Sequence, residues 1–106
     1  MSTSLSALSV LVVDDSAVIR TAFRDALAPF ADLSVDAVAS AEVARPRLLA
    51  TPPHVVILDI ELPGINGLAF LAEIMATHPM PVIVCSAQAG RGSTNAIRAL
   101  ELGAFE

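Results

Sequence analysis

Three short runs of consecutive apolar residues constrain the fold of this chain more than any other feature: VLVV at 10–13, VVIL at 55–58 and VIVC at 82–85. Each run has the length of a strand and no polar alternation, which is typical of strands whose two faces are both covered. Segments of helical period separate the runs. The pattern predicts an α/β fold, a doubly wound parallel sheet with helices on both faces and right-handed crossovers.

The expected elements follow one another as four β-α units. Strands are predicted at 8–13, 33–38, 55–58 and 82–85, and the alternating LSVDAV segment at 33–38 indicates an edge strand. Helices are predicted at 17–28, 41–50 and 68–76, and a fourth starts near Ser93 or Thr94 and ends at Gly103. Pro46 predicts that the second helix is kinked or begins late. The Pro-Gly and Asn-Gly pairs of ELPGING are expected to form a turn or loop between the third strand and its helix.

Composition excludes several classes of function. The 106 residues suit one domain, with 1–7 as an N-terminal tail and 8–106 as the folded part. The net charge is −5 and every basic residue is an arginine, so no basic stripe favours nucleic acid. The apolar runs are far shorter than the roughly 20 residues that span a bilayer, and no signal peptide is recognisable, so we expect a cytoplasmic protein. Cys85, inside PVIVCSA, is expected to be a small buried side chain.

Polar residues follow three of the predicted strands. Asp14 and Asp15 come after the first, Asp59 after the third and Ser86 after the fourth. Parallel strands end at the same edge of a sheet, so these side chains are expected to meet where such sheets bind ligands. Three neighbouring carboxylates would raise at least one pKa unless a cation lies between them. Oxygen ligands favour Mg²⁺, whereas His54 and His78 are isolated and read as turn or surface residues.

This combination of groups is suited to holding a phosphoryl group. Asp59 is a candidate nucleophile, because carboxylates form acyl phosphates, and the Ser86 hydroxyl is a candidate for binding phosphoryl oxygens. The alternative is structural, because an aspartate or serine after a strand often caps the following helix.

The same motifs resemble the receiver domain of response regulators in two-component signalling. They are VLVVDDS for the acidic pair, VVILDIELPGINGL for the phospho-acceptor and PVIVCSA for the hydroxyl, and Asp15 and Asp59 lie 44 residues apart (59 − 15). PMPVIVCSA and RGSTNAIRALELGAFE further resemble the receiver of the chemotaxis protein-glutamate methylesterases, the CheB-like subfamily. The resemblance implies a flavodoxin-like fold over residues 8–106.

The resemblance also implies roles for individual residues. Asp59 would accept a phosphoryl group from a sensor histidine kinase, with Mg²⁺ bound by Asp14, Asp15, Asp59 and the backbone carbonyl of Glu61. Ser86 would hold a phosphoryl oxygen. In such methylesterases the unphosphorylated receiver covers the catalytic domain. The sequence has no Gly-x-Ser-x-Gly elbow and no Ser-His-Asp set, so the chain itself is not expected to be an enzyme.

The family pattern continues with a fifth strand and helix, and with a lysine at the end of that strand. The sequence ends at GAFE and contains no lysine, so we expect a receiver truncated before the fifth unit. An uncovered edge at 82–85 and an uncovered first helix then predict a homodimer through this face.

Two other functions remain open at this stage. Absence of the lysine favours a receiver-like dimerisation or docking module that no longer accepts a phosphoryl group. An Mg²⁺-dependent aspartyl-phosphate phosphatase of the haloacid dehalogenase type would use Asp59 as nucleophile and Glu61 as acid. Its nucleophilic motif normally has two aspartates separated by one residue near the first strand, and neither that spacing nor its lysine is present here.

Overall fold

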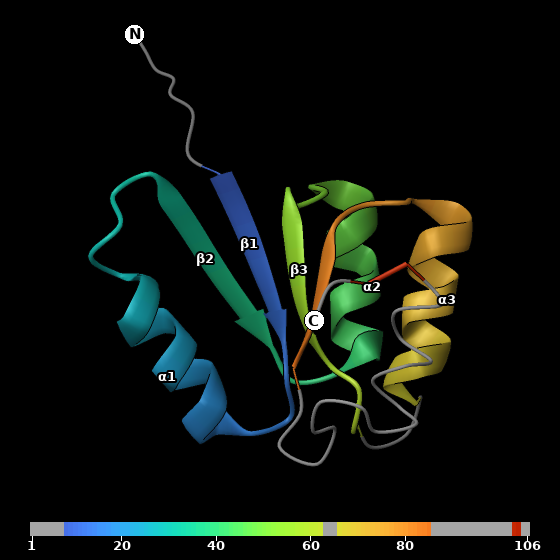
Figure 1. Cartoon of the computed structure of the whole chain (residues 1–106), viewed down its shortest axis with the longest axis horizontal. Helices are drawn as coiled ribbons and strands as arrows, with labels where there is room; N and C mark the ends of the chain where they lie inside the picture. The colour runs from blue at the N-terminus through green and yellow to red at the C-terminus, as the bar shows by residue number, and fades with distance from the viewer. Residues whose placement is uncertain (1–7, 63–65, 86–102, 105–106) are drawn as a thin grey trace, which may run out of the picture.

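The structure, a computed structural model, describes residues 8–62, 66–85 and 103–104 (Figure 1). Its strands are β1 (Leu8–Val13), β2 (Leu33–Val38), β3 (Val55–Asp59) and β4 (Val82–Cys85). Its helices are α1 (Ala17–Leu27), α2 (Ala41–Ala50) and α3 (Gly67–Thr77). The predicted elements in this part of the chain are confirmed to within one residue at each end. The fourth predicted helix, the tail at 1–7 and Ser86 lie outside the described residues.

The four strands form one parallel sheet in the order β2-β1-β3-β4. This order is that of the flavodoxin-like doubly wound folds, in which β1 and β3 are neighbours at the point where the strand order reverses. β2 lies at an edge, as its alternating sequence predicted, and its exposed and partly buried residues alternate. β1 and β3 therefore lie in the middle of the sheet, and their carboxyl ends come together at one rim.

Helices cover both faces of the sheet, α1 on one side and α2 with α3 on the other (Figure 1). The larger core lies between the sheet and the α2–α3 layer, where Phe70, Leu58 and Leu71 are completely buried. A smaller core on the α1 side contains Val10 and Val12, with partly buried side chains packed around them. The continuous apolar runs are thus explained, since successive residues of β1 face different cores.

α1 is less buried than its apolar stripe predicts. None of its residues is buried, and Val18 and Ile19 are exposed. Ile19, Ala22, Phe23 and Ala26 instead line an open groove of about 330 Å³ together with Cys85. The expectation that Cys85 is buried is therefore wrong, because it ends β4 on the sparsely covered side of the sheet, where the residue is exposed.

α2 begins directly after Ser40, whose hydroxyl accepts a hydrogen bond from the Val43 backbone N–H. Pro46 lies inside this helix, so the alternative of a late start is wrong. Arg45 of α2 makes a two-pronged ion pair with Glu73 of α3, at 2.6 and 3.0 Å, which ties the two helices together. None of the helices in the described ranges has the length and apolar character needed to cross a membrane.

Candidate metal and phosphoryl site

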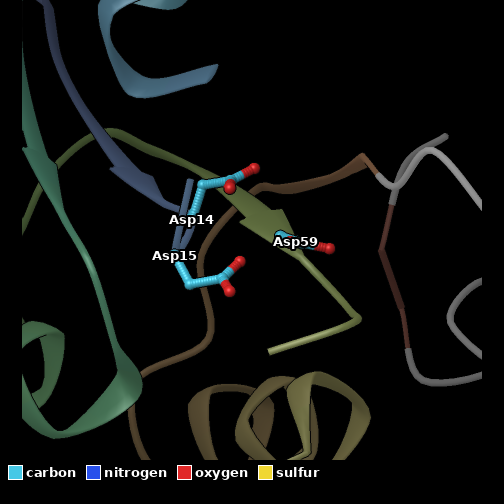
Figure 2. Close-up of side chains that lie close together, drawn as sticks. All are labelled: Asp14, Asp15 and Asp59. Atoms are coloured by element: carbon cyan, nitrogen blue, oxygen red, sulfur yellow. The ribbon is translucent and has the colours of Figure 1, made fainter. Parts of the chain in front are cut away.

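Three carboxylates meet at the rim formed by β1 and β3. Oxygen atoms of Asp14, Asp15 and Asp59 all lie within 4.8 Å of one another. Figure 2 shows the three side chains leaving the ends of the two strands and turning to the same side. The register explains the meeting, because Val13 of β1 pairs with Leu58 of β3, and the aspartates follow directly. The predicted convergence of these three residues is confirmed.

Asp14 is the most firmly held member of the cluster, with a 7% exposed surface. Its Oδ1 accepts a 2.9 Å hydrogen bond from the Ser16 backbone N–H, and its carbonyl accepts one of 2.8 Å from the Arg20 guanidinium. The N-cap of α1 is Ser16, whose hydroxyl accepts from the Ile19 N–H. The alternative that Asp14 or Asp15 is present to cap this helix is therefore wrong, and the side chain of Asp15 is left exposed at the rim.

Asp59 combines partial burial with close negative neighbours. Burial raises the pKa of the Asp59 carboxyl, and the charges of Asp14, Asp15 and Glu61 raise this pKa further. The Glu61 backbone N–H, which donates to Asp59 Oδ1 at 2.8 Å, acts in the opposite direction. The predicted perturbation of a carboxylate in this cluster is thus found at Asp59. A bound cation would lower the same pKa by compensating the neighbouring charges.

The raised pKa of Asp59 predicts a stability effect in metal-free protein. A carboxyl whose folded pKa is raised stabilises the fold below its ordinary pKa, and this stability is lost as the pH rises through the raised value. Asp59→Asn keeps an oxygen for the Glu61 N–H but removes the charge. Without Mg²⁺ at pH 7, and allowing for solvent screening of a partly exposed group, the variant should melt about 2–4 °C higher. The difference in melting temperature between the variant and wild type should shrink towards pH 4. An equal difference at pH 7 and pH 4 would contradict a raised pKa of Asp59.

The donor set fits Mg²⁺. The site supplies three carboxylates, and an octahedral ion with ligands at about 2.1 Å requires oxygens no more than about 4.2 Å apart, close to the 4.8 Å limit of this cluster. The carboxylate oxygens therefore need to approach one another by only about 0.6 Å to share an octahedral ion. Neither histidine contributes: His54 hydrogen-bonds Ser9 at the opposite end of β1, and His78 is the C-cap of α3. The predicted ligation by the Glu61 carbonyl stays a prediction, and the proposed hydroxyl of Ser86 is outside the described residues.

Two residues at this rim were not among the predicted site residues. Arg20 follows Asp14 by six residues, one turn into α1, and this spacing is the signal that brings its guanidinium back to the Asp14 carbonyl. Cys85 pairs with Asp59 in the β3–β4 register. Partial burial of the thiol, together with the charges of Asp14 and Asp59, raises the pKa of Cys85 and keeps it protonated at neutral pH.

Comparison with known proteins decides which family has this arrangement. The family model of the response regulator receiver domain matches residues 10–106, which is nearly the whole chain. The chain belongs to this receiver family. The match covers the ends of both strands of the acidic rim, and receivers generally bind Mg²⁺ at an acidic pocket.

The receiver is similar in sequence to the corresponding regions of chemotaxis methylesterases. A protein-glutamate methylesterase/protein-glutamine glutaminase of Geobacter metallireducens is 43% identical over 100 residues, covering 93% of this chain and 28% of the relative. One from Cereibacter sphaeroides is 46% identical over 98 residues, covering 92% and 27%. The receiver therefore spans less than a third of the length of these relatives.

A solved structure gives the same relationship. The response regulator domain of Thermotoga maritima CheB superposes on the receiver with a TM-score of 0.85 and 34% sequence identity, covering 94% of this chain and 77% of that one. The fold predicted from the apolar runs and the narrower resemblance to CheB-like receivers are both confirmed. The receiver is thus of the CheB type.

Proposed function

We propose that this receiver accepts a phosphoryl group on Asp59 from the phosphohistidine of a sensor kinase, with Mg²⁺ bound at the aspartate rim. The observation that carries the proposal is the approach of Asp14, Asp15 and Asp59 to within 4.8 Å at the ends of two central strands. Asp59 is only partly buried, so its carboxylate is accessible to an incoming phosphoryl donor. Asp14 and Asp15 are the residues that hold the cation beside it.

The transfer is an in-line displacement at phosphorus. A carboxylate oxygen of Asp59 forms the new O–P bond while the P–N bond to the kinase histidine breaks and its electron pair returns to the imidazole nitrogen. Asp59 must be ionised to attack. Because Asp59 Oδ1 accepts the Glu61 N–H, this hydrogen bond orients the carboxylate and favours its charged form. Mg²⁺, when bound, neutralises the charge that accumulates on the phosphoryl oxygens.

The receiver is proposed to act as a switch and not as an enzyme. The relatives carry the name of a methylesterase and glutaminase, but the receiver spans only 27–28% of their length. In a longer protein of this type, phosphorylation of Asp59 would relieve the cover that the receiver places over a catalytic domain. The rim is suited to this role because formation of an acyl phosphate on Asp59 changes the charge of the rim. This change occurs at the end of β3, where the rim faces solvent.

A phosphodonor assay tests the proposal. The protein is incubated with acetyl phosphate and Mg²⁺, and intact mass is measured for wild type and Asp59→Asn. One phosphoryl group on the wild type, absent from the variant and absent with excess EDTA, is the expected result. Beryllofluoride with Mg²⁺ should perturb the NMR signals of the rim in wild type alone.

The same assay separates the other two functions. A docking module that does not accept a phosphoryl group would remain unmodified, and beryllofluoride would leave its spectrum unchanged. An aspartyl-phosphate phosphatase would release inorganic phosphate over many turnovers. Either result would replace the proposed function.

We further propose that the receiver forms a homodimer through the α1 groove. Ile19, Ala22, Phe23 and Ala26 present an apolar surface beside Cys85, at the end of β4. Burial of this surface against a second copy would remove it from water. Light scattering at micromolar concentration is expected to give the mass of a dimer, and Phe23→Glu should convert it to monomer. A monomeric mass for wild type would overturn this proposal.

A further inference from the structure

α3 begins in direct contact with the backbone that follows the phospho-acceptor. A Cβ atom placed on Gly67 would lie 2.3 Å from Ile60 Cα, and 2.7 Å from both the Asp59 carbonyl oxygen and the Ile60 carbonyl carbon. Backbone atoms cannot rotate away as a side chain can. Among the described glycines, positive φ occurs at Gly103 and not at Gly67, so the helix needs glycine here for its small size. Glycine is otherwise unfavourable in a helix relative to alanine.

α3 is held too firmly to move away from this contact. Phe70, Leu71 and Ile74 are buried in the larger core, and the Asn66 side chain caps the first turn by accepting the Leu68 N–H at 2.7 Å. The ion pair between Arg45 of α2 and Glu73 of α3 adds a further link to this helix. Interiors are close-packed, so a helix with several fully buried residues resists displacement.

Ile60 is itself buried, but the turn at Ile60 and Glu61 is expected to yield before α3 does. It lies outside the strand ladder, whereas the preceding residues of β3 are paired with both β1 and β4. The turn is connected to the acidic rim, because the Glu61 N–H donates to Asp59 Oδ1 at 2.8 Å. Displacement of the turn therefore moves the carboxylate of Asp59.

We propose that Gly67 is a positioning residue of the phosphoryl-acceptor site. Its missing side chain lets α3 press the turn into the position from which Asp59 faces Asp14 and Asp15. This inference rests on the proposed function for its consequence in Mg²⁺ binding. The tolerance is small, because carboxylate oxygens spread over 4.8 Å must close to about 4.2 Å to share an octahedral ion. A shift of the turn by an ångström would remove a direct ligand.

The test compares two alanine substitutions at glycine. Gly67→Ala adds a methyl group against the turn. Gly103→Ala is the matched control, because its strained φ of 104° should also lower the melting temperature. The atoms nearest to the new Cβ belong to the flexible side chain of Met75, 3.7 Å away, and Met75 lies two turns after Gly67 in α3. Mg²⁺ affinity is measured by titration at a temperature where all proteins are folded. Hydrogen exchange of the Glu61 amide is measured without metal.

Gly67→Ala is expected to weaken Mg²⁺ binding about tenfold or more and to speed Glu61 amide exchange, while Gly103→Ala changes both by less than about twofold. Wild-type values in Gly67→Ala, or equal losses in both variants, would overturn the inference. If wild type binds no Mg²⁺, the proposed function fails, and the exchange rate still decides the positioning role. If Gly67→Ala does not fold, Asn66→Ala loosens the same turn of α3 by removing its cap, and unchanged Mg²⁺ affinity and unchanged Glu61 exchange in that variant would count against the inference.

Discussion

Replacing Phe70 by alanine is expected to lower the free energy of unfolding by about 3–5 kcal/mol, a large part of the stability of the protein. Phe70 is fully buried between the sheet and the α2–α3 layer, and the Arg45 guanidinium lies 5.8 Å from the centre of its ring. Removing a buried phenylalanine side chain costs about 3–5 kcal/mol, while a domain of this size has a total stability of about 5–15 kcal/mol. Urea unfolding followed by circular dichroism should show the loss as a lower midpoint with a similar slope.

The control for this prediction is the same substitution at an exposed phenylalanine. Phe30 lies in the turn between α1 and β2 and is 57% exposed, so Phe30→Ala should change the free energy of unfolding by less than about 0.5 kcal/mol. Equal losses from the two substitutions would show that α3 does not pack on the sheet as the structure has it.

The fold was predictable from sequence because its strands carry strong and separate signals. VLVV and VVIL are continuously apolar, and the structure places them in the middle of the sheet with a core on each face. LSVDAV alternates, and it forms the edge strand. Burial of individual residues was less predictable. The apolar stripe of α1 predicted a packed helix, but periodicity shows which face is apolar and does not show how much protein is available to cover it.

Prediction of the site succeeded where the backbone alone determines position. Asp14, Asp15 and Asp59 follow neighbouring parallel strands, so the register brings their backbone positions to the same rim, where their carboxylates meet. Gly67 was not recognised, because its role depends on the distance between a helix and a turn. The Asn-Gly pair predicted a turn or loop, whereas in the structure Asn66 is the N-cap of α3 and Gly67 is the first residue of the helix. Contacts of this kind need the packed fold.

Asp15→Asn is expected to weaken Mg²⁺ binding by about tenfold to a hundredfold while leaving the fold unchanged. Asp15 is the exposed member of the cluster, so the variant should melt within a few degrees of wild type. Two unit charges 4 Å apart interact by about 1 kcal/mol in water and about 4 kcal/mol near a protein surface, and a divalent ion doubles both values. Removing the Asp15 charge loses this attraction, but a water molecule replaces the missing ligand and recovers part of it. The expected net loss of Mg²⁺ binding free energy is about 1.4–2.8 kcal/mol.

The matched control is Asp25→Asn, which removes the same charge from an exposed position in the second half of α1. Salt screens charges separated by more than about 8–10 Å, so Asp25→Asn should change Mg²⁺ affinity by less than about twofold at physiological ionic strength. Titration calorimetry at two salt concentrations distinguishes the two effects, since a directly bound carboxylate retains its influence at high salt. Equal losses in the two variants would mean that the net charge of the protein attracts the ion, and that the three aspartates do not form a defined site.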